Sequence, residues 1–154
     1  MIVLDYSLRD PVGFLAPSDL PNLTFADVAM ELFQGDVIFI VNGVDLSMLR
    51  SIPLVHFAWT MFLEACALGQ DHEEARFGAA DVPPRWTFRL SNSCVLISRD
   101  DIAAVGKCGH AELIKATAEF GIRVYHALRD TLPAAAESKF LSNQYPYDRM
   151  EQCM

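Results

Sequence analysis

Apolar and polar positions alternate from Ile2 to Leu8, with one apolar set at every second residue. This period of two is typical of a half-buried β-strand, and it predicts a strand over 2–8. The next stretch, 11–21, contains three prolines and one glycine, so we expect a connecting loop there.

The stretch 25–46 contains two candidate turns. Asn42-Gly43 is a strong hairpin signal, and Gly35-Asp36 is a second possible two-residue turn. Between them, the run 37–41 (VIFIV) is apolar on both faces, so it must be covered on both sides or lie centrally in a sheet. We therefore predict a three-stranded antiparallel meander over about 26–33, 37–41 and 44–46.

A strongly apolar helix is predicted next. Ser51 before Ile52-Pro53 is a helix start, and Gly69 is a typical helix stop, so the helix should run to Leu68. Its apolar character indicates burial over most of its circumference. The polar positions recur every four residues and form one stripe: His56, Thr60 and Glu64.

The second half of the chain repeats the order of strands and then a helix. We expect a short strand near 75–77, a clear alternating strand over 85–90, and returning strands at 94–97 and 102–108. A long helix is predicted from His110 to about Leu132, ended by Pro133. Its core face is expected to carry Leu113, Thr117, Phe120, Val124 and Leu128.

These elements predict one α+β domain over 1–133, followed by a loosely held tail over 134–154. Its antiparallel sheet is built from two meanders, with two main helices packed against it. The chain has 154 residues, which suits a single domain, and 52% of them are hydrophobic.

Charge narrows the choice of partners. The 12 Lys and Arg residues face 20 Asp and Glu residues, so the formal net charge is -8. Such a field repels nucleic acid and anionic lipid and favours cationic partners, although acidic surfaces also serve solubility alone. Neither an export signal nor a membrane span is visible, so we expect a cytoplasmic protein with reduced cysteines.

Known catalytic and cofactor motifs are missing from the sequence. It has neither a phosphate-binding glycine loop nor a GxSxG nucleophile turn, and Cys and His spacings are too irregular for a metal. We therefore expect no enzyme activity, no cofactor and no metal. The alternative is a small ligand-binding protein or enzyme, in which a pocket beside His56, Thr60 and Glu64 provides an acid and a base.

Clustered carboxylates are the leading candidates for contact with a basic protein partner, since loops on a rigid scaffold often carry recognition. They lie in one loop region and at one turn. The candidates are Asp71, Glu73, Glu74, Asp81, Asp100 and Asp101.

Residues 25–68 carry a family resemblance. The runs from Asp27 to Val37 and from Phe39 to Leu46, with FQGDV and NGVDL within them, resemble small uncharacterised actinobacterial proteins and immunity proteins of polymorphic toxin systems. The resemblance implies a small acidic cytoplasmic α+β domain that blocks a toxin, and it assigns no binding residue. A homodimeric structural or interaction protein remains a further alternative.

Overall fold

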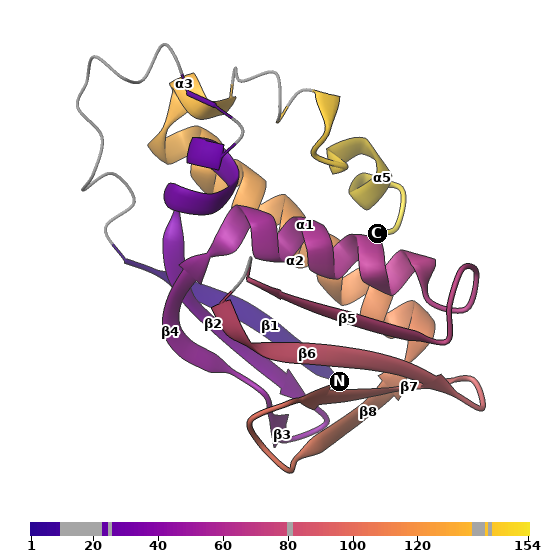
Figure 1. Cartoon of the computed structure of the whole chain (residues 1–154). Coiled ribbons are helices and arrows are strands. Elements are labelled where there is room, and N and C mark those ends of the chain that lie inside the picture. The colour runs from indigo at the N-terminus through magenta and orange to yellow at the C-terminus, as the bar shows by residue number, and fades with distance from the viewer. Residues whose placement is uncertain (10–22, 25, 80–81, 137–140, 142) are drawn as a thin grey trace.

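The computed structural model has an α+β fold, as predicted, with helices packed on two antiparallel sheets of four strands each (Figure 1). It describes residues 1–9, 23–24, 26–79, 82–136, 141 and 143–154. The expectation of a single sheet is therefore corrected, because the two meanders form separate sheets. The predicted loop over 11–21 lies outside the described residues.

The first sheet is arranged around one central strand. Strand β2 (Gln34–Val41) pairs with β1 (Ile2–Leu8) on one side and with β3 (Val44–Asp45) and β4 (Met48–Pro53) on the other. The predicted strand over 2–8 is confirmed. The Asn42-Gly43 turn is also confirmed, with φ values of 49° and 84°.

Two predictions in this region were wrong. Residues 26–33 do not form a strand, because Asp27–Glu31 is a short π-helix (η2) that begins with reciprocal hydrogen bonds between Thr24 and Asp27. Gly35 is not a turn residue but lies within β2. A Cβ there would lie 2.6 Å from the Ser7 carbonyl oxygen, so glycine permits close strand approach rather than a turn.

Helix α1 (Leu54–Ala67) begins later than predicted, because Ser51 and Pro53 belong to β4. Ile52 precedes a proline, which disfavours helical backbone at that position. Gly69, with a φ of 81°, follows the helix as predicted.

The second sheet is a simple meander, as predicted. Its strands are β5 (Glu74–Ala79), β6 (Val82–Ser91), β7 (Cys94–Arg99) and β8 (Val105–Gly109). Helix α2 (His110–Thr131) follows directly, and the short helices α3 (Pro133–Ala136) and α5 (Tyr147–Glu151) come later.

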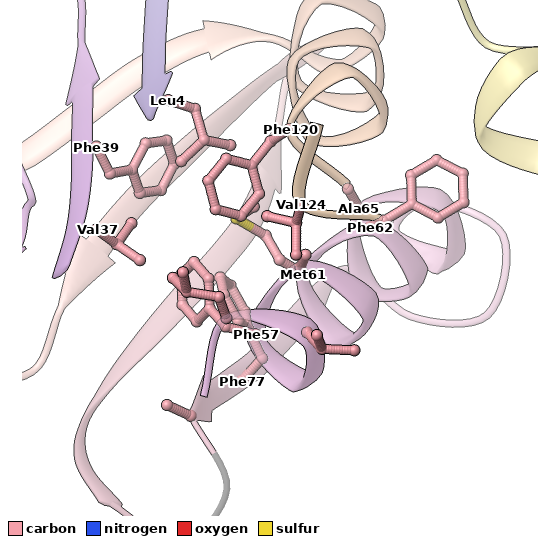
Figure 2. Packing of buried hydrophobic residues seen from close by; sticks show 14 of the residues in the cluster. Leu4, Val37, Phe39, Phe57, Met61, Phe62, Ala65, Phe77, Phe120 and Val124 are labelled. Atoms are coloured by element: carbon pink, nitrogen blue, oxygen red, sulfur yellow. The ribbon is translucent and has the colours of Figure 1, made fainter. Parts of the chain in front are cut away.

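Both sheets share one core with the two long helices. Helices α1 and α2 lie against each other, and each also contacts both sheets (Figure 1). Figure 2 shows Leu4 and Phe39 of the first sheet facing Phe120 of α2, with Phe57 of α1 and Phe77 of β5 completing the cluster. The predicted core face of α2 is confirmed, because all five of its residues are buried.

The end of the chain contacts α2. Tyr145 is buried, and its hydroxyl donates a hydrogen bond of 2.9 Å to the Gly121 carbonyl. Met150 of α5 is also buried beside Gly121. This part of the 134–154 segment therefore contributes to the core.

Candidate interaction surface

The loop between α1 and β5 presents part of the predicted acidic cluster. Asp71 and Glu73 are exposed and make no ion pair with any described residue. Glu74 is exposed too, but its Oε2 lies 2.6 Å from Arg89 Nη2 on the neighbouring strand. Asp81 lies outside the described residues.

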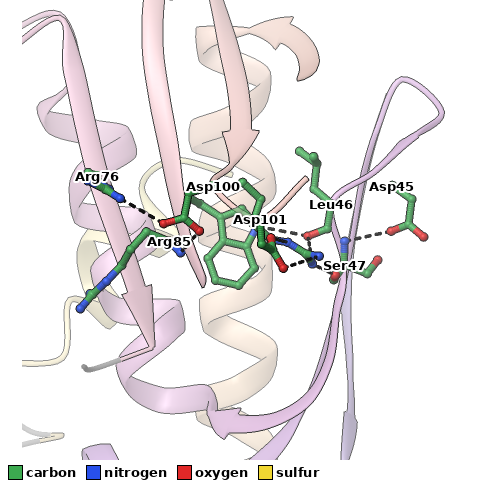
Figure 3. Close-up of polar contacts among 9 residues, drawn as sticks. Asp45, Leu46, Ser47, Arg76, Arg85, Asp100 and Asp101 are labelled. Carbon is green, nitrogen blue, oxygen red and sulfur yellow. Dashed lines mark hydrogen bonds and ion pairs between the residues drawn. The ribbon is translucent and has the colours of Figure 1, made fainter. Parts of the chain in front are cut away.

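The side chains of the Asp100-Asp101 turn interact with other residues of the protein (Figure 3). Asp100 accepts a hydrogen bond of 3.0 Å from the Arg85 backbone N–H and pairs with Arg76, and these contacts hold the pKa of Asp100 below its usual value. Asp101 lies 2.6 Å from Arg99. The structure therefore separates the predicted carboxylates into an open pair, Asp71 and Glu73, and three that are ion-paired within their own sheet.

Arg99 also joins the two sheets. Its guanidinium donates to the carbonyls of Leu46 and Ser47, and the Trp86 indole N–H donates to the same Leu46 carbonyl over 3.1 Å. This polar cluster is structural, because each of these hydrogen bonds connects the second sheet to the segment between β3 and β4.

The predicted stripe on α1 makes local contacts. The Thr60 hydroxyl donates to the His56 carbonyl over 2.9 Å, and Glu64 Oε2 lies 3.2 Å from His72 Nε2. The His56 ring meets the Trp59 ring edge-on. All three stripe residues are half-buried. Glu64 thus interacts with a histidine of the following loop, while the Thr60 hydroxyl is bound to backbone.

None of the four cysteines forms a disulfide, and two of them are buried. Burial raises the pKa of Cys66, and it raises the pKa of Cys108 to about 12. Because the thiolate is the reactive form, these two thiols are poor nucleophiles at neutral pH.

A groove of about 510 Å³ runs between the Asn42-Gly43 turn and β8. Two of its polar side chains are bound within the protein. Asn42 Nδ2 donates to the Lys107 carbonyl over 2.6 Å, and Glu112 accepts the Gly109 N–H.

The outer face of the first sheet was not predicted as a site. Pairing places Val3 opposite Ile40, Asp5 opposite Ile38, and Asp45 opposite Ile40, so all five side chains share one face. Val3 is 39% exposed, both isoleucines are partly exposed, and both aspartates are exposed. We call these five residues the acidic-apolar face.

Most of the charge on this sheet is negative. Its four strands carry Asp5, Asp36 and Asp45 against one cation, Arg50. Asp36 pairs with Arg9 over 3.0 Å, whereas Asp5 and Asp45 make no ion pair within the described part of the chain. Hydrogen bonds from Ser47 lower the pKa of Asp45, so this carboxylate stays ionised at neutral pH.

The outer face of the second sheet differs in charge. It carries Arg76, Arg85, Arg89 and Lys107, with Glu74 directly opposite Arg89. Leu96, half-buried, lies opposite Arg89 on one side and Lys107 on the other. Arg76 and Arg89 are ion-paired, so this face is largely neutralised by its own contacts.

The sequence contained one sign of the acidic-apolar face. The run 37–41 was expected either to be covered on both sides or to lie centrally in a sheet. It belongs to the central strand β2, which pairs with strands on both edges, and only one of its faces is fully buried. Val37, Phe39 and Val41 are fully buried, whereas Ile38 and Ile40 remain partly exposed.

No family model matches the chain, and neither a curated protein nor a solved structure is significantly similar to it. Within the described residues, no group of three or more His, Cys, Asp or Glu side chains is arranged to hold a metal. None of the helices described is both long and apolar enough to cross a bilayer.

Proposed function

We propose that this protein is a binding protein that inhibits another protein, most concretely a cytoplasmic immunity protein that neutralises a cognate toxin. Inhibition would be steric and electrostatic, with no chemical step. The observation that carries the proposal is the acidic-apolar face, where exposed and partly exposed apolar side chains lie beside exposed carboxylates.

Protein interfaces commonly have an apolar centre and a polar rim, and contiguous apolar surface on a soluble domain often marks a contact site. An antiparallel sheet with one face on the core usually presents polar residues on the other. The outer side of this sheet carries Val3, Ile38 and Ile40 in addition to its aspartates, which supports a binding role.

Catalysis receives less support from the same structure. Thr60 and Glu64 interact with neighbouring groups, and burial suppresses ionisation of Cys66 and Cys108. The net charge of -8 supports a cationic partner, because opposite charges accelerate association.

Co-expression tests this proposal. The protein encoded beside this gene is induced in a bacterial host, alone and together with the present chain. We expect growth arrest alone, rescue by the chain, and a 1:1 complex on gel filtration. A neighbour that neither harms the host nor binds the chain would overturn the immunity assignment.

A further inference from the structure

We infer that the acidic-apolar face is the docking surface and that its partner presents a basic protein surface with an apolar centre. This inference rests on the proposed function and assigns it to one side of one sheet.

The apolar part of the face is continuous across strands. Val3 and Ile40 are direct cross-strand neighbours, and Ile38 lies two residues along β2 on the same side. β4 adds exposed Leu49 to the same sheet, with 73% of its surface accessible. Covering these side chains removes apolar surface from water, which is a main source of binding free energy.

The carboxylates determine the partner's charge. Asp5 lies opposite Ile38 and Asp45 opposite Ile40, so a partner that covers the apolar residues of the acidic-apolar face contacts both aspartates. Since neither aspartate pairs with a described cation, lysine or arginine side chains of a partner can pair with them. A second copy docked face to face would instead oppose like charges, which disfavours it.

The second sheet provides a matched control. Leu96 is also a half-buried apolar residue on an outer strand face, but its cross-strand neighbours are the cations Arg89 and Lys107. A basic partner should avoid that face. The same substitution at Ile40 and Leu96 therefore separates docking from general effects on the fold.

The first experiment locates the contact in living cells of the source organism. The photoreactive amino acid benzoylphenylalanine replaces Ile40 or, as control, Leu96 in the full chain, and adducts are identified by mass spectrometry. We expect one basic protein linked at position 40 and not at position 96. Linkage to an acidic protein, to a second copy of the chain, or equally at both positions would overturn the inference.

The second experiment uses the purified partner so identified, or the co-expressed neighbour. Isothermal titration compares wild type with Ile40→Thr and Leu96→Thr, both checked for folding by circular dichroism. We expect Ile40→Thr to raise the Kd about tenfold or more and Leu96→Thr to leave it within about twofold. Asp5→Lys should also weaken binding, and Asp5→Asn should do so less.

Failure of the surface and failure of the function give different results. If the complex forms and all these variants bind like wild type, the docking surface lies elsewhere and the binding function survives. If no complex forms with any protein, the proposed function fails as well.

Discussion

The side chain of Arg99 is largely buried, with only 13% of its surface exposed, and it makes several contacts. It donates to two backbone carbonyls of the segment between β3 and β4, pairs with Asp101, and lies 6.0 Å from the Trp86 ring centre. Removing it would take this donor from the partly buried Ser47 carbonyl and would leave the Leu46 carbonyl with the Trp86 indole N–H, and the loss of such hydrogen bonds is costly.

Arg99→Ala should therefore lower the free energy of unfolding by about 2–3 kcal/mol. The matched control is Arg89→Ala, whose ion pair with Glu74 is exposed and should contribute less than about 1 kcal/mol. Urea denaturation of both variants measures the difference. Equal losses would show that the Arg99 contacts do not join the sheets energetically.

Cys108 predicts a pH effect with a definite sign. Burial raises its pKa to about 12 from an unfolded value of 9.0, so its proton is held more tightly in the folded state. Stability from this thiol is complete below pH 9 and is lost as pH rises towards 12, because the unfolded chain ionises first.

At pH 10 this effect amounts to about 1 kcal/mol. Wild type should therefore lose more stability than Cys108→Ala between pH 8 and pH 10, even though the variant is less stable at both. Urea denaturation at the two pH values measures this. Parallel losses in the two proteins would contradict the assigned cause.

At the scale of elements, β8 and β2 approach closely where Gly106 meets Val41. A Cβ at Gly106 would lie 2.7 Å from the Val41 Cβ, and Val41 is fully buried. The contact therefore leaves no space for an added methyl group.

Gly106→Ala should lower the free energy of unfolding by about 1–3 kcal/mol through overpacking. In a Val41→Ala background the added methyl group has room, so its cost should shrink by about 0.5 kcal/mol or more. A double-mutant cycle by thermal or urea unfolding tests this, and strictly additive losses would rule out the contact as the cause.

The elements that could be predicted from the sequence depend mostly on local pattern. The strand at 2–8, the Asn42-Gly43 turn, the second meander and α2 all follow from alternation, turn residues or helical periodicity. The errors have local and distant causes. Thr24 and Asp27 cap a short helical turn in a stretch that was predicted as a strand from its residue types. Glycine is needed at position 35 because the Ser7 carbonyl, 28 positions earlier in the chain, leaves no room for a Cβ.

The candidate site follows the same division. The exposure of Asp71 and Glu73 could be predicted from composition and from their position in a loop. The arginine partners of Asp100 and Glu74 could not, because they depend on strand register. The pairing of Val3 with Ile40 joins residues far apart in sequence. Alternation alone could show that Ile38 and Ile40 share a side, but not that this side lacks cover.

At the scale of the whole molecule, charge is divided between the sheets. Three aspartates and one arginine lie on the strands of the first sheet, against five cations and one glutamate on those of the second. The net charge of -8 therefore conceals one sheet with an open acidic face and another whose cations are largely paired internally. An electrostatically guided partner should distinguish the two.

Salt dependence of binding tests the central claim most directly. The purified partner is titrated with wild type and with Asp5→Lys by calorimetry at about 50 and about 500 mM salt. The Debye length is longer than about 10 Å at the lower salt concentration and shorter than about 10 Å at the higher one. The wild-type Kd should rise about tenfold or more with salt, and the variant should bind more weakly with a smaller salt response. A wild-type Kd insensitive to salt, or equal salt responses in both proteins, would contradict docking of a basic partner on the acidic-apolar face.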